Sequence, residues 1–209
     1  MSLSQLPFTE LLNAFKSAEP TPGGGSASAL GGAVGASLLA MVARLPKPRT
    51  QGTEETERLT AAGARCAALA DSLAALMDRD SHAYDLVVAA FRLPKGTENE
   101  SMARGIRIQE ALHAATEAPL AVMRACAEAI GLAAVVAAFG NRNAASDVQV
   151  GVELLRAGLR GAKVNVDVNL ASIKDGTLSA AIRREAEHLT VEGERGASAA
   201  VSRLESEQS

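Results

Sequence analysis

Apolar residues recur along this chain mainly three and four positions apart, which is the repeat of an amphipathic α-helix. Prolines, glycines and polar turns divide this pattern into helical stretches. We predict helices over residues 3–17, 26–45, 53–92, 98–139 with a kink or interruption at Pro119, 147–159 and 178–204. Residues 163–173 leave helix and strand open, because three valines alternate there as in a strand while asparagines interrupt them.

The second and third predicted helices end at the same tetrapeptide, Arg-Leu-Pro-Lys, at residues 44–47 and 92–95. A cation is favourable at the C-terminus of a helix, and a proline cannot continue the helix. Pro48 adds a further break after the first copy. We interpret the repeat as a shared stop signal and not as an internal duplication.

Small side chains must build the core of this protein. Of its 209 residues, 47% are hydrophobic and 22% charged, but only 2% are aromatic and none is Trp. Gly31, Gly32 and Gly35 would destabilise an exposed helix, but they permit close packing of a buried one. Small residues supply little apolar area, so we expect a homodimer or larger homo-oligomer. The prediction is an all-α fold: a single domain over residues 1–209, a dimerising bundle of long helices with small-residue packing.

The charge and cysteine content exclude several classes of function. The net charge is −3, and no face interleaves Lys, Arg and aromatic residues, so we expect no nucleic-acid partner. Cys66 and Cys126 lie far apart without a CxxC motif, which favours buried thiols and a reducing, cytoplasmic location. Residues 1–7 lack the basic block and the apolar block that a signal peptide has. The uncharged run 27–43 is too rich in Ala, Gly and Ser for a membrane span, so we predict a buried helix and no membrane contact.

One charged residue interrupts an apolar stripe of the third predicted helix. The stripe has spacings of three or four residues and consists of Leu69, Leu73, Met77, Asp80, Tyr84, Val87 and Phe91. A carboxylate on such a stripe loses hydration, so Asp80 must be ion-paired, hydrogen-bonded or protonated. Such a carboxylate suits acid–base catalysis, and a structural ion pair with an arginine from another helix is the alternative.

Asp78, His82 and Asp85 lie on a different face of the same predicted helix. These side chains could ligate a metal, but three ligands from one short helical face make a poor closed site. A helix surface with two carboxylates and a histidine is usually just solvated. We therefore expect no metal.

Two groups of turn residues could bind a ligand. The triple glycine 23–25 allows close backbone approach, and Ser26 can cap the following helix, whose free N–H groups attract polar oxygens. This segment lacks the Lys-Ser/Thr ending of a phosphate loop and follows no strand, so nucleotide binding is disfavoured, and a flexible turn is the alternative.

The second group comprises Gly140-Asn141-Arg142-Asn143, Ser146-Asp147, Asn165 and Asn169. Singly these are common helix caps, but their density suggests the polar edge of a ligand site.

Taken together, these segments resemble the cyclodeaminase/cyclohydrolase family, which comprises the C-terminal half of formiminotransferase-cyclodeaminase and free-standing bacterial relatives. The matching pieces occur in the family's order and span most of the chain. They are Thr21-Pro22-Gly23-Gly24-Gly25-Ser26, Met41-Val42, Asp78-x-Asp80 with Ala83-Tyr84, Arg92-Leu93-Pro94-Lys95, Ile108-Gln109-Glu110-Ala111-Leu112, Pro119-Leu120, Gly140-Asn141, Ser146-Asp147-Val148-Gln149-Val150, Gly161-Ala162 and Asn165-Val166-x-Val168-Asn169-Leu170. No single piece is specific, whereas the ordered set is.

The resemblance implies an all-α fold that works as a dimer or higher assembly on a tetrahydrofolate derivative, without a metal or redox cofactor. The second Asp of the family's Asp-x-Asp motif is its proposed acid/base group, and that position is Asp80 here. Lys95, rather than Lys47, is expected to face the glutamate tail of the folate, because only its Arg-Leu-Pro-Lys matches a family motif. The other expected substrate-binding residues are Gly23, Gly24, Gly25, Ser26, Asn141, Ser146, Asp147, Asn165 and Asn169.

Two folate reactions fit this resemblance. Hydrolysis of 5,10-methenyltetrahydrofolate to 10-formyltetrahydrofolate is the first choice, because the sequence contains no formiminotransferase domain to hand over a formimino substrate. The alternative is a formiminotetrahydrofolate cyclodeaminase, which closes the ring of 5-formiminotetrahydrofolate and releases ammonia. A non-catalytic helical assembly module is the alternative from another class. The Ala-rich composition favours such a module, whereas Asp80 in its apolar stripe opposes it.

Overall fold

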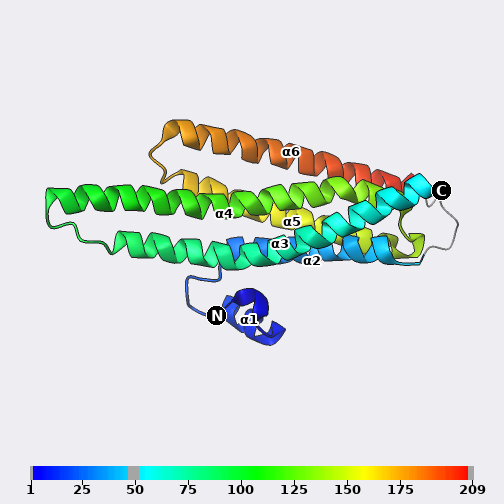
Figure 1. Ribbon diagram of the computed structural model, residues 1–209, viewed down its shortest axis with the longest axis horizontal. Helices are drawn as coiled ribbons and strands as arrows, with labels where there is room; N and C mark the ends of the chain where they lie inside the picture. Colours follow the sequence, from blue (N-terminus) through cyan, green and yellow to red (C-terminus); the bar gives the residue numbers. More distant parts are fainter. Residues whose placement is uncertain (1, 47–51, 207–209) are drawn as a thin grey trace.

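Long helices that run up and down along one axis make up the fold (Figure 1). The computed structural model describes residues 2–46 and 52–206. Within these residues the elements are η1 Leu3–Gln5, α1 Phe8–Lys16, α2 Gly24–Arg44, α3 Thr53–Phe91, α4 Glu98–Phe139, η2 Arg142–Ala144, α5 Ala145–Leu170 and α6 Gly176–Ser206. The predicted all-α fold is confirmed.

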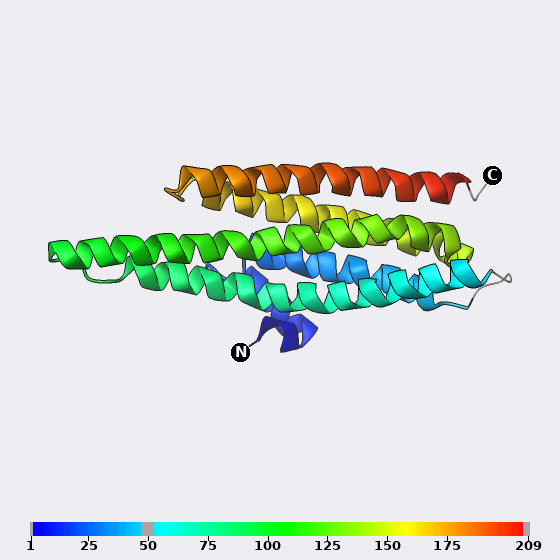
Figure 2. The same ribbon diagram turned by 45° about the horizontal axis from the view of Figure 1, so that its top comes forward.

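The five long helices form a bundle with α4 at its centre. Helix α4 packs on α3, α5 and α6, while α2 packs on α3 and α5. The short helix α1 lies outside the bundle, beside its middle (Figures 1 and 2). One continuous hydrophobic core runs through the bundle and draws residues from every one of these helices.

Pro7 divides the first predicted helix. Residues 3–17 form η1 and α1 rather than one helix, because Pro7 lies between them and has no N–H to donate. The second and third helices end at Arg44 and Phe91, as the repeated tetrapeptide predicts. Pro48, the further break expected after the second helix, lies outside the described residues.

Residues 163–173, for which the sequence left helix and strand open, are helical as far as Leu170 and form the last turns of α5. The strand alternative is therefore wrong, and the predicted helix 147–159 is too short. Val166 is fully buried there, whereas the side chains of Val164 and Val168 are 61% and 65% exposed. The alternation of the valines reflects two sides of one helix.

The sequence predicted a kink or an interruption of the fourth helix at Pro119. Helix α4 continues through this residue without an interruption. A proline lacks the N–H that would bond to the carbonyl four residues earlier, which here belongs to Ala115. The side-chain amide of Asn169 on α5 donates to that carbonyl, with an N···O distance of 2.8 Å. Helix α5 thus replaces the hydrogen bond that the proline removes.

Glycines bring the backbones of α2 and α5 into direct contact. A Cβ added at Gly35 would lie 2.6 Å from the carbonyl oxygen of Gly151 and 2.9 Å from Cγ of Leu155. A Cβ added at Gly158 would lie 2.8 Å from the carbonyl oxygen of Ser28. Such distances are too short for a real side chain, so the predicted close packing through small residues is confirmed at these positions.

We expect Gly35→Ala to lower the free energy of unfolding by about 1–3 kcal/mol, because the two backbones must move apart to admit the methyl group. Gly131→Ala is the matched control, since it also lies within a helix and its Cβ would meet nothing within 4 Å. The control should raise the free energy of unfolding by about 0.5–1 kcal/mol through helix propensity alone. Urea unfolding measures both, and an unchanged midpoint for Gly35→Ala would contradict the packing argument.

Among the described residues, three helices are long and apolar enough to cross a membrane by length and composition: α2, α3 and α4. Half of the relevant stretch in α2 and in α4, and 39% of that in α3, is buried inside the protein. A substantial part of this apolar surface therefore serves the core of the bundle.

Helix α2 begins well short of the ends of its neighbours (Figures 1 and 2). Its first turn lies beside Asp80 of α3, and α3 continues from there to Phe91. The apolar stripe of α3 is accordingly buried up to Met77, whereas Tyr84 and Phe91 are 41% and 51% exposed. The stripe faces the core of this chain only as far as Asp80, which lies at the edge of the core.

Candidate active site

The first turn of α2 offers backbone N–H groups that no residue of its own turn satisfies. The N-cap is Gly23, which has no side chain, so the expectation that Ser26 caps this helix is wrong. The carboxylate of Asp80 takes that role from α3, because it accepts a hydrogen bond from the backbone N–H of Ser26. A charged residue 54 positions away along the chain thus completes the start of the helix.

The hydroxyl of Ser26 is fully buried and points at the same carboxylate. Its Oγ lies 2.9 Å from Oδ2 of Asp80, 3.1 Å from the carbonyl oxygen of Met77 and 3.2 Å from Oγ of Ser81. A hydroxyl has one proton, so Ser26 donates to one of these acceptors at a time. Its contribution is therefore a switchable hydrogen bond to the carboxylate.

Gly25 is required at its position because of the carboxylate. A Cβ added there would lie 2.6 Å from Cγ of Asp80, a distance that real side chains do not reach. A Cβ added at Gly24 would instead lie 3.5 Å from Nδ2 of Asn165, which is ordinary contact. The triple glycine therefore allows a close backbone approach to the carboxylate of Asp80, whereas the approach to a ligand expected from the sequence stays a prediction.

Burial raises the pKa of the Asp80 carboxyl above its usual value, and the two hydrogen bonds from Ser26 oppose this rise without cancelling it. The polar partner of Asp80 is thus a serine, and the structural alternative of an ion pair with arginine finds no support in the described contacts. A half-buried carboxylate with a raised pKa, beside the first turn of α2, is suited to accept and return a proton.

Asn165 lies next to this centre on α5. Its side chain is beside Gly24, and its Nδ2 donates to the carbonyl oxygen of Gly161 one turn earlier, at 2.9 Å. Three helices therefore converge at one point: α2 through its first turn, α3 through Asp80 and α5 through Asn165.

Residues 7–188 match the formiminotransferase-cyclodeaminase family. The chain is 40% identical to the methenyltetrahydrofolate cyclohydrolase of Methylorubrum extorquens over 87% of either chain. It is 31% identical to the formimidoyltransferase-cyclodeaminase of Sus scrofa over 99% of this chain, which spans only 38% of that protein. The crystal structure of formiminotetrahydrofolate cyclodeaminase from Thermotoga maritima has a TM-score of 0.83 and 28% identity, and the match covers 98% of both chains.

The chain belongs to the formiminotransferase-cyclodeaminase family. The resemblance stated from the sequence motifs is therefore confirmed. Of the motifs that carried it, the structure brings together the triple glycine with Ser26, the second carboxylate of the Asp-x-Asp pair, Asp80, and Asn165.

Asn141, Ser146 and Asp147 lie away from this centre in the same chain. Asn141 caps η2 through its Oδ1, and its Nδ2 donates to the carbonyl oxygen of Pro46, just after the other end of α2. Helix α2 has 21 residues and is therefore about 30 Å long, so Asn141 at its end lies about that far from Asp80 at its start. The side chain of Ser146 is exposed, and that of Asp147 is half-buried, in the first turn of α5.

Neither Asn169 nor Lys95 has a described contact with Asp80. The amide of Asn169 is turned towards α4, where it serves the carbonyl of Ala115. Lys95 is exposed in the turn after α3, beyond Phe91. Lys47, to which no binding role was given, lies outside the described residues.

Asp78, the first carboxylate of the Asp-x-Asp pair, holds the N-terminal segment. Its oxygens accept hydrogen bonds from the hydroxyls of Ser2 and Ser4, both at 2.8 Å, and from the backbone N–H groups of Leu3 and Ser4. Burial tends to raise the pKa of this carboxyl, but the four donors outweigh it and hold the pKa below its usual value. Asp78 thus has a structural role, because its carboxylate holds residues 2–4 against α3.

A polar groove of about 480 Å³ lies beside α3, next to the start of α2. It is lined by Ser2, Leu3, Thr21, Pro22, Asp78, Ser81, His82 and Asp85. Ser81 is a functional candidate that the sequence did not reveal, because its position beside Ser26 and the groove follows only from how the helices pack. It faces both this groove and the hydroxyl of Ser26.

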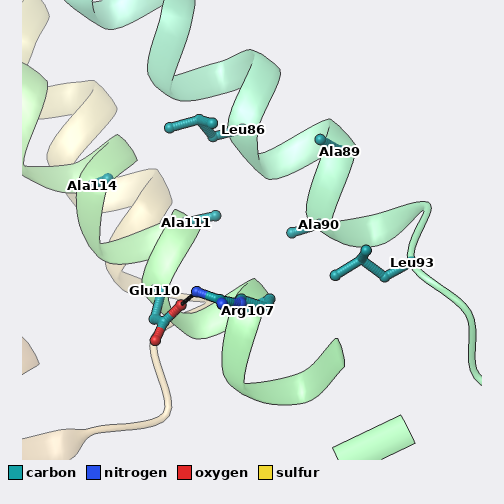
Figure 3. Close-up of a pocket in the computed structure, with 8 residues that line it drawn as sticks. All are labelled: Leu86, Ala89, Ala90, Leu93, Arg107, Glu110, Ala111 and Ala114. Atoms are coloured by element: carbon teal, nitrogen blue, oxygen red, sulfur yellow. Dashed lines mark hydrogen bonds and ion pairs between the residues drawn. The ribbon is translucent and has the colours of Figure 1, made fainter. Parts of the chain in front are cut away.

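A second groove, of about 410 Å³, lies between the end of α3 and the start of α4 (Figure 3). Its lining is mostly apolar and comprises Leu86, Ala89, Ala90, Leu93, Arg107, Glu110, Ala111 and Ala114. The charged pair in it, Arg107 and Glu110, is joined by an ion pair of 2.8 Å. Because that carboxylate is already paired, the start of α2 remains the better candidate for acid–base chemistry.

Proposed function

We propose that this protein hydrolyses 5,10-methenyltetrahydrofolate to 10-formyltetrahydrofolate, with Asp80 as the acid–base group. The observation that carries the proposal is the half-buried carboxylate of Asp80, held by Ser26 at the start of α2 with a raised pKa. The 40% identity to a methenyltetrahydrofolate cyclohydrolase, over 87% of both chains, supports this choice of reaction.

The chemistry of the substrate fits a lone carboxylate. The 5,10-methenyl bridge is a cationic amidinium, which the ionised carboxylate of Asp80 attracts. Water adds to the bridging carbon while the carboxylate takes one of its protons. The carboxylic acid then returns that proton to N5 as the C–N5 bond breaks, and the carboxylate so formed takes the proton of the remaining hydroxyl to leave the 10-formyl group. The net reaction consumes one water and releases one proton, without a metal or redox cofactor.

A cyclodeaminase activity is the second candidate, favoured by the likeness to the Thermotoga maritima structure and the formimidoyltransferase-cyclodeaminases. In that reaction N10 attacks the formimino carbon and Asp80 protonates the departing ammonia. Loss of the 5,10-methenyltetrahydrofolate absorbance, measured beside ammonia release from 5-formiminotetrahydrofolate, decides between them. If the protein shows no turnover of either substrate and no folate binding by calorimetry, both activities are contradicted and a non-catalytic module is favoured.

We further propose that the protein works as a homodimer or larger homo-oligomer in the cytoplasm, free of membrane and nucleic acid. The support is the exposure of large apolar side chains beyond the start of α2, among them Tyr84, Phe91, Val164 and Val168. A second copy would also be the source of Asn141 and the residues near it, if they bind the same folate as Asp80. Lys95 would then face the glutamate tail. Size-exclusion chromatography with light scattering tests the assembly, and a monomer at micromolar concentration would contradict it.

Ser26→Ala is expected to move the acidic limb of the pH profile of kcat/KM to higher pH. The hydrogen bonds of Ser26 lower the pKa of Asp80, so removal of the hydroxyl leaves burial less opposed and the pKa rises further. Because water attack needs the ionised carboxylate, the variant loses activity at a pH where the wild type is still active. An acidic limb that stays in place or moves to lower pH would contradict the role given to this hydroxyl.

A further inference from the structure

We infer that Ser26 and Ser81 form a hydroxyl relay that carries the proton from Asp80 to the polar groove beside α3. The inference rests on the proposed function, because that reaction releases one proton per turnover. A folate bound over Asp80 shields the carboxylate from bulk water on the substrate side. A second path to solvent would let the carboxylate reset while the ligand is in place.

The distances form a continuous hydrogen-bonded chain. Oδ2 of Asp80 is 2.9 Å from Oγ of Ser26, and that oxygen is 3.2 Å from Oγ of Ser81. Ser26 is fully buried, so its hydroxyl exchanges protons only through its neighbours. Ser81 is half-buried and lines the groove. The buried hydroxyl is therefore the link between the carboxylate and the groove.

The transfer leaves both serines neutral. The protonated carboxyl of Asp80 gives its proton to Oγ of Ser26, while Ser26 passes its own hydroxyl proton to Oγ of Ser81. Ser81 in turn passes its own hydroxyl proton to a water in the groove. The three O–H bonds that break are replaced by three that form, and the carboxylate is again ionised. Rotation of the hydroxyls restores the starting direction, with the carbonyl of Met77 as a resting acceptor for Ser26.

The groove is suited to receive the proton. Its volume of about 480 Å³ is large compared with the roughly 30 Å³ that a water occupies in the liquid. Its polar lining includes the imidazole of His82 and the carboxylate of Asp85, both of which can hydrogen-bond to such water. Asp78 anchors the N-terminal segment that forms one wall, through its bonds to residues 2–4.

Ser81→Ala tests the relay, because it removes the hydroxyl between Ser26 and the groove. We expect kcat to fall by roughly 10-fold, less than on loss of the acid–base group itself, with KM nearly unchanged. The solvent deuterium isotope effect on kcat should rise, because proton transfer becomes slower. Ser81→Thr keeps a hydroxyl at the position and should restore kcat. Ser72→Ala is the matched control on α3, since its hydroxyl bonds only within its helix, to the carbonyl of Ala68.

Several outcomes would overturn the relay. They are an unchanged kcat and isotope effect in Ser81→Ala, a change confined to KM, or a loss that Ser81→Thr does not restore. Should the alanine variant not fold by circular dichroism, Ser81→Cys replaces it, because a thiol is a weak hydrogen-bond donor and should lower kcat in the same way. Wild-type turnover of 5,10-methenyltetrahydrofolate is measured first, so its absence refutes the proposed function, whereas failure of the serine variants alone refutes the relay.

Discussion

Asp80→Asn is expected to lower kcat for 5,10-methenyltetrahydrofolate hydrolysis by ~10³-fold, within the range for loss of a general acid–base group. The amide has nearly the size of the carboxylate, and its Oδ1 can still accept the hydrogen bonds of Ser26. It cannot take a proton from water or return one to N5. Steady-state kinetics measures the loss, and retention of wild-type kcat would exclude the proposed role.

The stability of the same variant separates a catalytic carboxylate from a structural one. Burial raises the pKa of Asp80 in the folded state, so folding favours the protonated form. The stabilisation of that form is complete below the unfolded pKa of ~3.9 and is lost as the pH rises through the higher folded pKa. At pH 7 the buried charge therefore destabilises the fold, and Asp80→Asn should have a Tm equal to or above that of the wild type.

The advantage of the amide should shrink as the pH falls towards 4, because the wild-type carboxyl then becomes neutral as well. Differential scanning calorimetry of both proteins at pH 7 and near pH 4 provides the comparison. A Tm at pH 7 several degrees below that of the wild type would mean that Asp80 is mainly a cap for α2. Reduced activity would then have a structural cause.

Gly25→Ala is expected to lower kcat by ~10²-fold, the scale associated with a misplacement of about 1 Å in an active site. The new methyl group would lie 2.6 Å from Cγ of Asp80, so the carboxylate must move away from the start of α2. That movement also breaks the hydrogen bonds from Ser26. The helix itself should persist, because alanine favours a helix more than glycine does.

Gly31→Ala is the matched control for this substitution. It lies in the same helix, and its Cβ would meet the carbonyl oxygen of Leu154 at 3.8 Å, which is ordinary contact. Its kcat should stay within about twofold of the wild type, while circular dichroism should show equal helicity for both variants. Equal kinetics for Gly25→Ala and Gly31→Ala would show that contact between backbone and carboxylate is not needed for turnover.

Local patterns were enough to single out Asp80, because a charge on a helical stripe of apolar residues is visible from spacing alone. Local patterns also indicated that Asn141 could be a helix cap, and its side chain does cap η2. The role of Ser26 was not visible. It was expected to cap its own helix, whereas its side chain meets a carboxylate 54 residues further on. Its partner depends on how α2 and α3 are placed, which no local pattern records.

Asn169 illustrates the same limit. From the sequence it belonged to a polar edge for a ligand, but its amide bonds the carbonyl of Ala115, which Pro119 leaves without a donor. The proline and the asparagine lie on different helices, so their relation exists only after α4 and α5 pack. Ser81 was missed for this reason too, because its significance comes from Ser26 and from the groove.

The sequence by itself determined the all-helical fold, the helix ends at proline and glycine, the family and the charged residue at position 80, because these follow from spacing and from ordered motifs. Only the tertiary structure decided that α2 starts against that residue, that Gly25 and Ser26 hold its carboxylate, and that burial raises its pKa. The physical reason is that desolvation and hydrogen bonding depend on which atoms lie nearby in space, and those atoms come from helices distant in the chain.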